Sequence, residues 1–480
     1  MLFTEPTFLF LFLPILLALY YGGRDRPSYC NWVLVIASVL FYAKGGGSFT
    51  LLMLSSIAFN YGAAIVVDRT RGSGRERLML SAAVGINLAV LAFFKYADFL
   101  VANASALWTT TGGTALAAPG VVLPIGISFY TFHAISYVVD VYRRDADAQK
   151  HPVHAALYLL LFPQLIAGPI IRYRDLATQL ARRVVSLDDV AWGARRFTIG
   201  LAKKMLVANV VAEAADGVFG LPIAQVSPAH AWLGVVCYTF QIYFDFSGYS
   251  DMAIGLGRMF GFRFPENFRW PYTATSVQDF WRRWHLSLSS WFRDYLYIPL
   301  GGSRGSSGRT AFNLLTVFFL CGLWHGASWT FVIWGLYHGA FLMAERVGVG
   351  AVLSRAWRPA QHVYALLVVF VGWVFFRAET LDHALGMLAA LAGRAAATPT
   401  PFTVQWYLTP LVAIALAVAC IGSLPIGDWL TRRFESSRGP EVRPSPLEAT
   451  FNLAVTTVLL LTSITQIAAN TYNPFIYFRF

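Results

Sequence analysis

The sequence has 480 residues, of which 57% are hydrophobic and only 13% are charged. A soluble globular domain rarely has this composition, so we predict a polytopic membrane protein embedded in a lipid bilayer. The net charge of +12 would suggest nucleic acid for a soluble protein, but here the cations lie mostly between apolar runs, where they indicate membrane orientation, and no nucleic-acid partner is expected.

The first part of the chain alternates between apolar runs and loops of different charge. Each run can contribute to a transmembrane helix, which needs about 20 predominantly apolar residues. Residues 24–26 and 69–77 are basic, whereas residues 103–120 carry no charge. This alternation predicts an outside N-terminus and cytosolic basic loops. The runs are residues 8–21, 32–42, 51–67 and 78–94.

Two apolar runs in the middle of the chain are interrupted. Residues 121–142 begin with the letters LPIGIS at 123–128, and residues 158–167 end at Gly168 and Pro169. Irregular backbone at membrane depth is tolerated only where protein or water covers it, so re-entrant or irregular entry is expected here. Later apolar runs bring the expected total to roughly ten to twelve spans. They are residues 232–254, 312–344, 365–376, 408–424 and 453–468.

Residues 258–309 form a basic, aromatic segment without a clean span. Ser276 can cap a helix, with Asp279 three residues later. One face of this single expected helix carries Trp281, Trp284, His285 and Leu288, and the cations Arg282, Arg283 and Arg293 fall largely off it. Such a helix is expected in the cytosolic membrane interface, and the alternative is a packed helix with core aromatics.

His325 is the leading candidate for chemistry, because it lies in the uncharged run 312–344. It is about 24 Å from Arg309 along a continuous helix, deep in the bilayer. Gly326 and Ser328 would allow the helix to kink or open beside it. A buried neutral imidazole can take a proton from a hydroxyl, as a general base does in acyl transfer. The alternative is a core histidine bonded to a carbonyl, and the residues alone do not decide between them.

Other polar groups have weaker assignments. His338 is expected to be a core residue, and His285 alone is more typical of an interface anchor. Asp245 and Asp251 either orient a catalytic or substrate group or mark a polar break near an interface.

Several chemistries lack their motifs. The sequence has no phosphate-binding G-x-x-x-x-G-K-[ST] and no H-E-x-x-H, and its four cysteines show no metal-ligand or disulfide spacing, so no metal site is expected. Residues 301–305 fit G-x-S-x-G, but a predicted helix and Pro299 precede them instead of a strand, so a serine hydrolase is not expected.

The motifs resemble those of the membrane-bound O-acyltransferase family, and within it the membrane subunit of bacterial alginate-type polysaccharide O-acetyltransferases. The resemblance spans most of the chain. It rests on residues 123–130 (LPIGISFY), 168–170 (GPI), 244–251 (FDFSGYSD), 265–268 (PENF), 279–289 (DFWRRWHLSLS), 291–302 (WFRDYLYIPLGG), 323–326 (LWHG) and 475–480 (FIYFRF).

This resemblance implies one all-α membrane domain over residues 1–480, a bundle of about ten to twelve transmembrane helices with re-entrant and interfacial helices around a central tunnel. Residues 258–309 would be a cytosol-side interfacial segment within it. It implies acetyl-CoA as a cytosolic acyl donor, no permanently bound cofactor, and a bacterial inner-membrane location with a periplasmic N-terminus. His325 would be essential, His285 would be the second important polar residue, and a separate periplasmic acetyltransferase would complete the transfer. The residues expected to contact substrate are Trp324, Trp281, Trp284, Arg282, Arg283, Arg293, Asp245 and Ser328.

Rival functions remain at this stage. A glycan or lipid transporter would show paired repeats, and none is evident. A scaffold for a polysaccharide synthase would leave the arginine, tryptophan and histidine motifs unexplained. Alginate, cellulose, another exopolysaccharide and peptidoglycan all fit as the acceptor.

Overall fold

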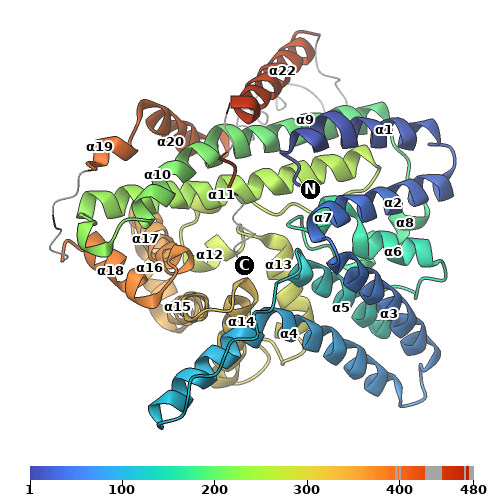
Figure 1. The fold of residues 1–480 in the computed structure, drawn as a ribbon, viewed down its shortest axis with the longest axis horizontal. Coiled ribbons are helices and arrows are strands. Elements are labelled where there is room, and N and C mark those ends of the chain that lie inside the picture. The colour runs from blue at the N-terminus through green and yellow to red at the C-terminus, as the bar shows by residue number, and fades with distance from the viewer. Residues whose placement is uncertain (395–397, 399–401, 427–445, 470–471, 475–480) are drawn as a thin grey trace. The chain divides into compact units, whose positions relative to one another are not determined.

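The computed structural model describes residues 1–480 except 395–397, 399–401, 427–445, 470–471 and 475–480 (Figure 1). The basic loop predicted around residues 432–443 and the closing motif at 475–480 therefore lie outside the described residues. Within the described part, every regular element is a helix, and the all-α prediction is confirmed.

Several helices have the composition of membrane spans. By length and hydropathy, four described helices can cross a bilayer: α3 (Phe49–Arg69), α4 (Glu76–Thr110), α17 (Arg358–Arg377) and α22 (Pro446–Ala469). Shorter apolar helices cover Phe8–Gly22, Leu381–Leu391 and Pro410–Gly422. The chain is thus a membrane protein, and the larger number of spans stays a prediction.

The chain divides into two compact units, and the chain passes from one to the other within α9, within α11 and after Pro265. Unit 1 comprises residues 1–197 and 252–265, and unit 2 comprises residues 198–251 and 266–480. Such units need not be independent domains, so the single-domain prediction is not tested by this division.

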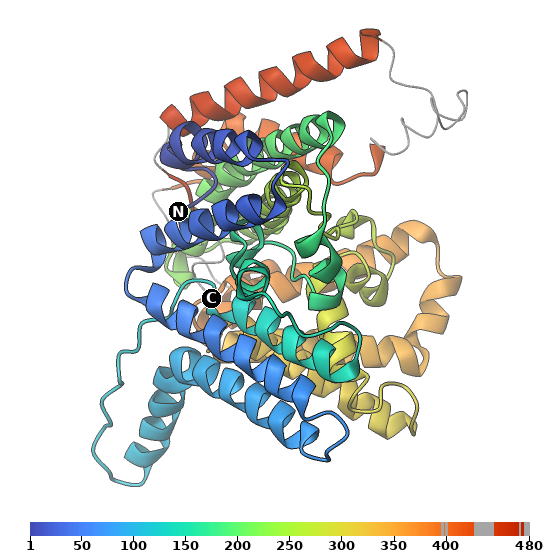
Figure 2. The same cartoon turned by 90° about the vertical axis from the view of Figure 1, so that its right-hand side faces the viewer.

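Unit 1 is built from the N-terminal helices. The α3, α4 and α5 helices lie side by side (Figure 2). Asn60 and Asn87 exchange side-chain hydrogen bonds of 3.0 and 2.8 Å between α3 and α4. The α5 helix follows Gly126, whose positive φ of 74° ends an irregular stretch, as the LPIGIS letters predicted. The helices are α1 (Leu13–Gly22), α2 (Pro27–Gly46), α3, α4, α5 (Ile127–Arg143), α6 (Pro152–Leu160), α7 (Phe162–Leu165), α8 (Tyr173–Ala181) and most of α9 (Leu187–Ala202), with the π-helical turn Phe8–Phe12.

Unit 2 holds the predicted chemistry. Its three longest helices among the described residues are α11 (Pro228–Met259), which ends in unit 1, α22 and α17. The other helices are α10 (Asn209–Phe219), α12 (Val277–Trp281), α13 (Leu286–Phe292), α14 (Ser307–His325), α15 (Trp329–Ala344), α16 (Gly350–Arg355), α18 (Leu381–Leu391), α19 (Val404–Tyr407) and α20 (Pro410–Gly422). Shorter turns are Lys203–Ala208, Ile223–Gln225, Pro271–Thr273, Arg293–Tyr297 and Glu345–Val349.

A tight helical hairpin places His325. The α14 helix ends at His325, Gly326 is extended, and α15 begins after Ser328, so the predicted opening beside the histidine is confirmed. Glycines bring the two helices together: a Cβ on Gly322 would lie 2.3 Å from the Phe331 carbonyl oxygen, and one on Gly335 would lie 2.2 Å from that of Phe318. The hairpin therefore depends on backbone contact that only glycine permits.

The prediction of one unbroken helix after Ser276 is wrong, and its interfacial location stays a prediction. Ser276 does cap a helix, accepting a 3.0 Å hydrogen bond from the Asp279 backbone N–H. That helix, α12, ends at Trp281, and α13 starts only at Leu286. Between them His285 has left-handed backbone angles (φ 43°, ψ 56°), which stop a right-handed helix.

Candidate active site

His325 lies inside an aromatic enclosure in unit 2. Only 4% of its surface is exposed. Its ring centroid lies 4.8 Å from that of Trp324, 5.0 Å from Trp334 and 5.1 Å from Phe376, each edge-on. Because α14 ends at this residue, the imidazole is placed by the hairpin and is buried among three aromatic rings.

His285 is buried as deeply, with 1% exposure, and a hydrogen-bonded asparagine holds it. The Nδ1 of His285 lies 3.0 Å from Oδ1 of Asn267. The same oxygen accepts from the backbone N–H of Ser287 at 3.3 Å and from its hydroxyl at 2.9 Å. The Asn267 carbonyl accepts from the Leu286 N–H at 2.9 Å, so residue 267 fixes both the ring and the start of α13.

These contacts define the tautomer of His285. A backbone N–H can only donate, so the Asn267 atom facing Ser287 is the amide oxygen, and Nδ1 of His285 must carry the proton. Its Nε2 then carries a lone pair, and this buried atom has no hydrogen-bond partner among the described residues. His285 lies outside the candidate spans, and burial lowers its pKa to about 3, so the ring is neutral at physiological pH.

One aromatic network links the two histidines. The Trp324 ring, packed on His325, lies 6.3 Å from the His285 ring. Phe246 packs edge-on against His285 at 4.6 Å. Trp281 lies 5.7 Å from Trp334, and Trp284 lies 4.9 Å from Trp373. The structure thus brings together five of the residues predicted from sequence, namely His285, His325, Trp324, Trp281 and Trp284.

Asp245, which was predicted to contact substrate, forms a buried ion pair with Lys204. Its carboxylate lies 2.6 Å from Nζ of Lys204, and both side chains are buried. Lys204 also donates to the carbonyl of Pro474. Nearby, Asn209 donates to Asn473 at 3.2 Å, and the hydroxyl of Tyr472 donates to Asp216. This network ties residues 472–474 to the turn Lys203–Ala208 and to α10, and it gives Asp245 a structural partner.

The three arginines predicted to contact substrate differ in exposure and in their hydrogen bonds. Arg283 donates to Asp279 at 2.8 Å and is held within the chain. Arg293 is exposed and donates to Asp294 at 2.7 Å. Arg282 is exposed and has no side-chain hydrogen bond or ion pair among the described residues. Ser328 caps α15, accepting from the Thr330 N–H at 3.3 Å, which accounts for its position without a substrate.

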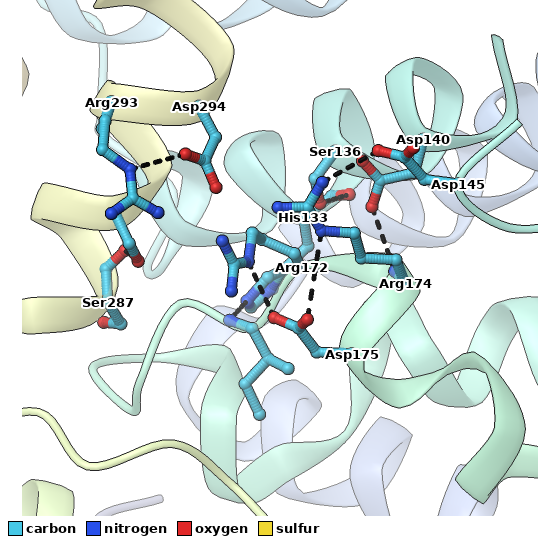
Figure 3. Close-up of polar contacts among 12 residues, drawn as sticks. His133, Ser136, Asp140, Asp145, Arg172, Arg174, Asp175, Ser287, Arg293 and Asp294 are labelled. Atoms are coloured by element: carbon cyan, nitrogen blue, oxygen red, sulfur yellow. Dashed lines mark hydrogen bonds and ion pairs between the residues drawn. The ribbon is translucent and has the colours of Figure 1, made fainter. Parts of the chain in front are cut away.

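The Gly-Pro-Ile break in unit 1 is also organised by a buried histidine (Figure 3). Nε2 of His133 accepts from the Ile171 N–H at 3.3 Å, and Tyr158 donates to the Ile171 carbonyl at 2.9 Å. Arg172 then pairs with Asp175 at 2.7 Å, and the Arg174 side chain pairs with Asp145 at 2.8 Å. These contacts explain how irregular backbone is satisfied there.

Sequence reasoning missed two residues of the site. Asn267 lay within the PENF letters but was given no role, although an amide can fix a histidine tautomer. Trp334 follows His325 in the same apolar run, and nothing in its spacing distinguished it from a core tryptophan. Among the described residues, no cluster of three His, Cys, Asp or Glu side chains could hold a metal ion.

Fold and site define an all-helical membrane protein in which three buried histidines, His285, His325 and His338, lie in one aromatic network. The chain belongs to the membrane-bound O-acyltransferase family, whose sequence profile matches residues 127–381.

Several curated proteins are similar over long stretches. A probable alginate O-acetylase AlgI from Azotobacter vinelandii is 42% identical over 504 residues, covering 100% of both chains. The protein of that name from Pseudomonas aeruginosa is 47% identical over 398 residues, covering 82% of this chain and 75% of its own. A peptidoglycan O-acetyltransferase from Helicobacter pylori is 37% identical over 428 residues, covering 82% of this chain and 80% of its own.

Proposed function

We propose that this protein is an O-acetyltransferase that takes acetyl groups from cytosolic acetyl-CoA and passes them across the bacterial inner membrane to an extracytoplasmic polysaccharide. The observation that carries the proposal is the pair of buried histidines, His285 and His325, joined through Trp324. The family supplies O-acyl transfer as the reaction class. The 42% full-length identity to the Azotobacter vinelandii alginate O-acetylase supports an alginate-type acceptor over peptidoglycan, since the Helicobacter pylori peptidoglycan O-acetyltransferase is 37% identical over 82% of this chain.

In the proposed reaction, His325 is the general base. Its imidazole takes the proton of an acceptor hydroxyl while the hydroxyl oxygen forms a bond to the acetyl carbonyl carbon. The carbon–sulfur bond then breaks, and CoA leaves as the thiol after taking up a proton. An acyl-enzyme route is the alternative. A deep base reached from both faces by a tunnel lets the acetyl group cross while CoA stays in the cytosol.

His285 has the complementary role of orienting a reactant. Because Nδ1 donates to Asn267, its free Nε2 lone pair accepts a hydrogen bond and does not polarise a carbonyl, which would need a proton on that nitrogen. Orientation of the thioester is therefore favoured over polarisation of its carbonyl. Arg282 and Arg293 are the better candidates for CoA phosphates because both are exposed, whereas the Arg283 side chain is partly buried and engaged with Asp279.

The test is acetyl transfer by purified protein in lipid nanodiscs. His325→Ala should abolish CoA release from acetyl-CoA, while the matched change His151→Ala, at an exposed histidine of unit 1, should leave it unchanged. Near-parental turnover by a folded His325→Ala protein would falsify the proposal. A parental protein that moves a glycan or lipid but releases no CoA would establish the transporter alternative.

The acceptor and partner need a separate test. We propose a multi-pass protein with a periplasmic N-terminus, as the basic loops suggest, that works with a periplasmic acetyltransferase. Cells lacking that partner should keep CoA release in membranes yet lose polysaccharide acetylation. Ester-linked acetate is then measured on alginate, cellulose and peptidoglycan from these cells and from parental cells. The acceptor is the polymer that loses its acetate when the partner is absent.

A further inference from the structure

The segment between α15 and α17 exposes apolar side chains that the proposed reaction does not use. This segment, residues 345–358, comprises the turn Glu345–Val349, α16 and the residues that lead into α17. Val347 is 79% exposed, Val352 is 73% exposed and Trp357 is 78% exposed. Apolar surface gains free energy when it leaves water, so three large exposed apolar side chains in one short segment indicate a surface that something apolar covers.

Arginines accompany these apolar side chains. Arg346, Arg355 and Arg358 are all exposed, and none forms an ion pair within the part of the chain that the structure describes. Nη1 of Arg346 lies 3.5 Å from the hydroxyl oxygen of Ser303. Exposed apolar groups interspersed with uncompensated cations are typical of a segment that lies on an anionic membrane surface.

The neighbouring helix places the segment where a span leaves the bilayer. The α17 helix has the length and hydropathy of a membrane span, and it begins at the residue after Trp357. Tryptophan and arginine at the end of a span lie at the level of the lipid headgroups. The contact between Arg346 and Ser303 brings the segment to the loop of unit 2 that is predicted to be cytosolic.

A polar cavity of about 270 Å³ lies beside the segment. Its wall includes Arg346, Gly350 and Ser354 of the segment, together with Thr275, Ser276 and Gln278 before and within α12. The Glu345 carboxylate, also in the wall, accepts from the backbone N–H groups of Val277 at 2.6 Å and Gln278 at 2.9 Å. The Arg346 guanidinium therefore remains for an anionic ligand, and the hydroxyl and amide side chains suit hydroxyl groups beside that anion.

We propose that residues 345–358 and this cavity bind an anionic phospholipid of the cytosolic leaflet, of the phosphatidylglycerol class. Arg346 pairs with the lipid phosphate, and the hydroxyl and amide side chains of the cavity bind the glycerol hydroxyls of the headgroup. The exposed apolar side chains insert among the acyl chains, and the other two arginines meet the phosphates of surrounding lipids. This site goes beyond the proposed function, because its ligand is neither the acyl donor nor the acceptor.

Native mass spectrometry of the full-length protein in detergent tests the site directly. The protein is titrated with phosphatidylglycerol and, separately, with phosphatidylcholine of the same acyl chains. The parental protein should bind one phosphatidylglycerol more tightly than any phosphatidylcholine. Arg346→Gln should weaken that tightest binding about tenfold and leave phosphatidylcholine binding unchanged, because it removes the cation and keeps a polar side chain. Arg394→Gln, at an exposed arginine outside the segment, is the matched control and should change neither.

Two results of this titration would overturn the proposal. One is the same affinity for phosphatidylglycerol in the Arg346→Gln and Arg394→Gln proteins. The other comes from soluble glycerophosphoglycerol, which has the headgroup but no acyl chains and should compete only weakly. If it displaces the bound lipid at concentrations equal to those of the lipid, the cavity takes a free phosphodiester and the lipid assignment is wrong.

A fluorescence measurement covers the case in which Arg346→Gln does not fold. Brominated acyl chains quench nearby tryptophans, and the difference between the parental protein and Trp357→Phe in nanodiscs isolates the signal of Trp357. At equal mole fraction, brominated phosphatidylglycerol should quench this signal more strongly than brominated phosphatidylcholine. Equal quenching by the two lipids overturns the proposal. Neither measurement uses acetyl-CoA, so failure of the lipid site and failure of the proposed function are distinguished.

Discussion

His285 shows how a single residue can carry both backbone strain and chemistry. It is one of three non-glycine residues with positive φ among those described, and such a conformation costs on the order of 1–3 kcal/mol. Asn267 offsets that cost, because its main-chain oxygen binds the Leu286 N–H and its side chain binds the imidazole. The sequence predicted that His285 is important, but it did not predict the left-handed turn. The helical spacing of Trp281, Trp284 and His285 fits an unbroken helix equally well.

The first prediction concerns the charge state of His285. Asn267→Asp would place a carboxylate against Nδ1, favour the imidazolium and raise the pKa of His285 from about 3. Since the neutral ring is the competent form, activity should begin to fall at a higher pH as the assay is acidified. The measurement is the pH profile of CoA release, and an acid limb that coincides with the parental one contradicts the assigned contact.

The second prediction concerns the buried ion pair. Lys204→Met leaves the Asp245 carboxylate in the interior without its cation and should destabilise the protein by about 3–5 kcal/mol. Thermal unfolding in detergent reports the change. The double variant Lys204→Met, Asp245→Leu should recover much of the loss, and a double variant less stable than the single one argues against the pair.

At the scale of elements, the α14–α15 hairpin depends on glycine. Gly322→Ala places a methyl group 2.3 Å from the Phe331 carbonyl oxygen, so the helices must separate at a cost of about 1–3 kcal/mol. The melting temperature should fall, and CoA release should fall with it because His325 ends α14. Gly308→Ala in the same helix, with nothing within 4 Å, is the control and should be neutral or stabilising.

Apolar runs predicted helices well where one run makes one helix. The run at residues 51–67 corresponds to α3 and that at 232–254 to the longer α11. Apolar runs predict helix ends poorly where contacts with residues outside the run break the helix. The break at His285 depends on Asn267, which lies on another segment, and the contact of Trp334 with His325 depends on two glycines whose role is visible only once the helices meet.

At the scale of the whole molecule, the loop charges predict sidedness. In a background with Cys420→Ala, which removes the exposed cysteine and leaves the three buried ones, single cysteines at Thr114 and Ser303 test it. Both sites are exposed in the fold. A membrane-impermeant maleimide should label Thr114→Cys in intact spheroplasts and Ser303→Cys only after the membrane is opened. The reverse pattern would invert the proposed topology.

The contacts of residues 472–474 have a consequence for biosynthesis. The hydroxyl of Tyr472 hydrogen-bonds to Asp216, which is 256 residues earlier in the sequence. The carbonyl of Pro474 accepts from Lys204, which is 270 residues earlier. A ribosome translates and inserts the earlier helices long before it reaches these residues. During that interval the turn Lys203–Ala208 lacks its last hydrogen-bond partners, so the nascent chain passes through a stage at which membrane chaperones and proteases can distinguish it from the finished protein.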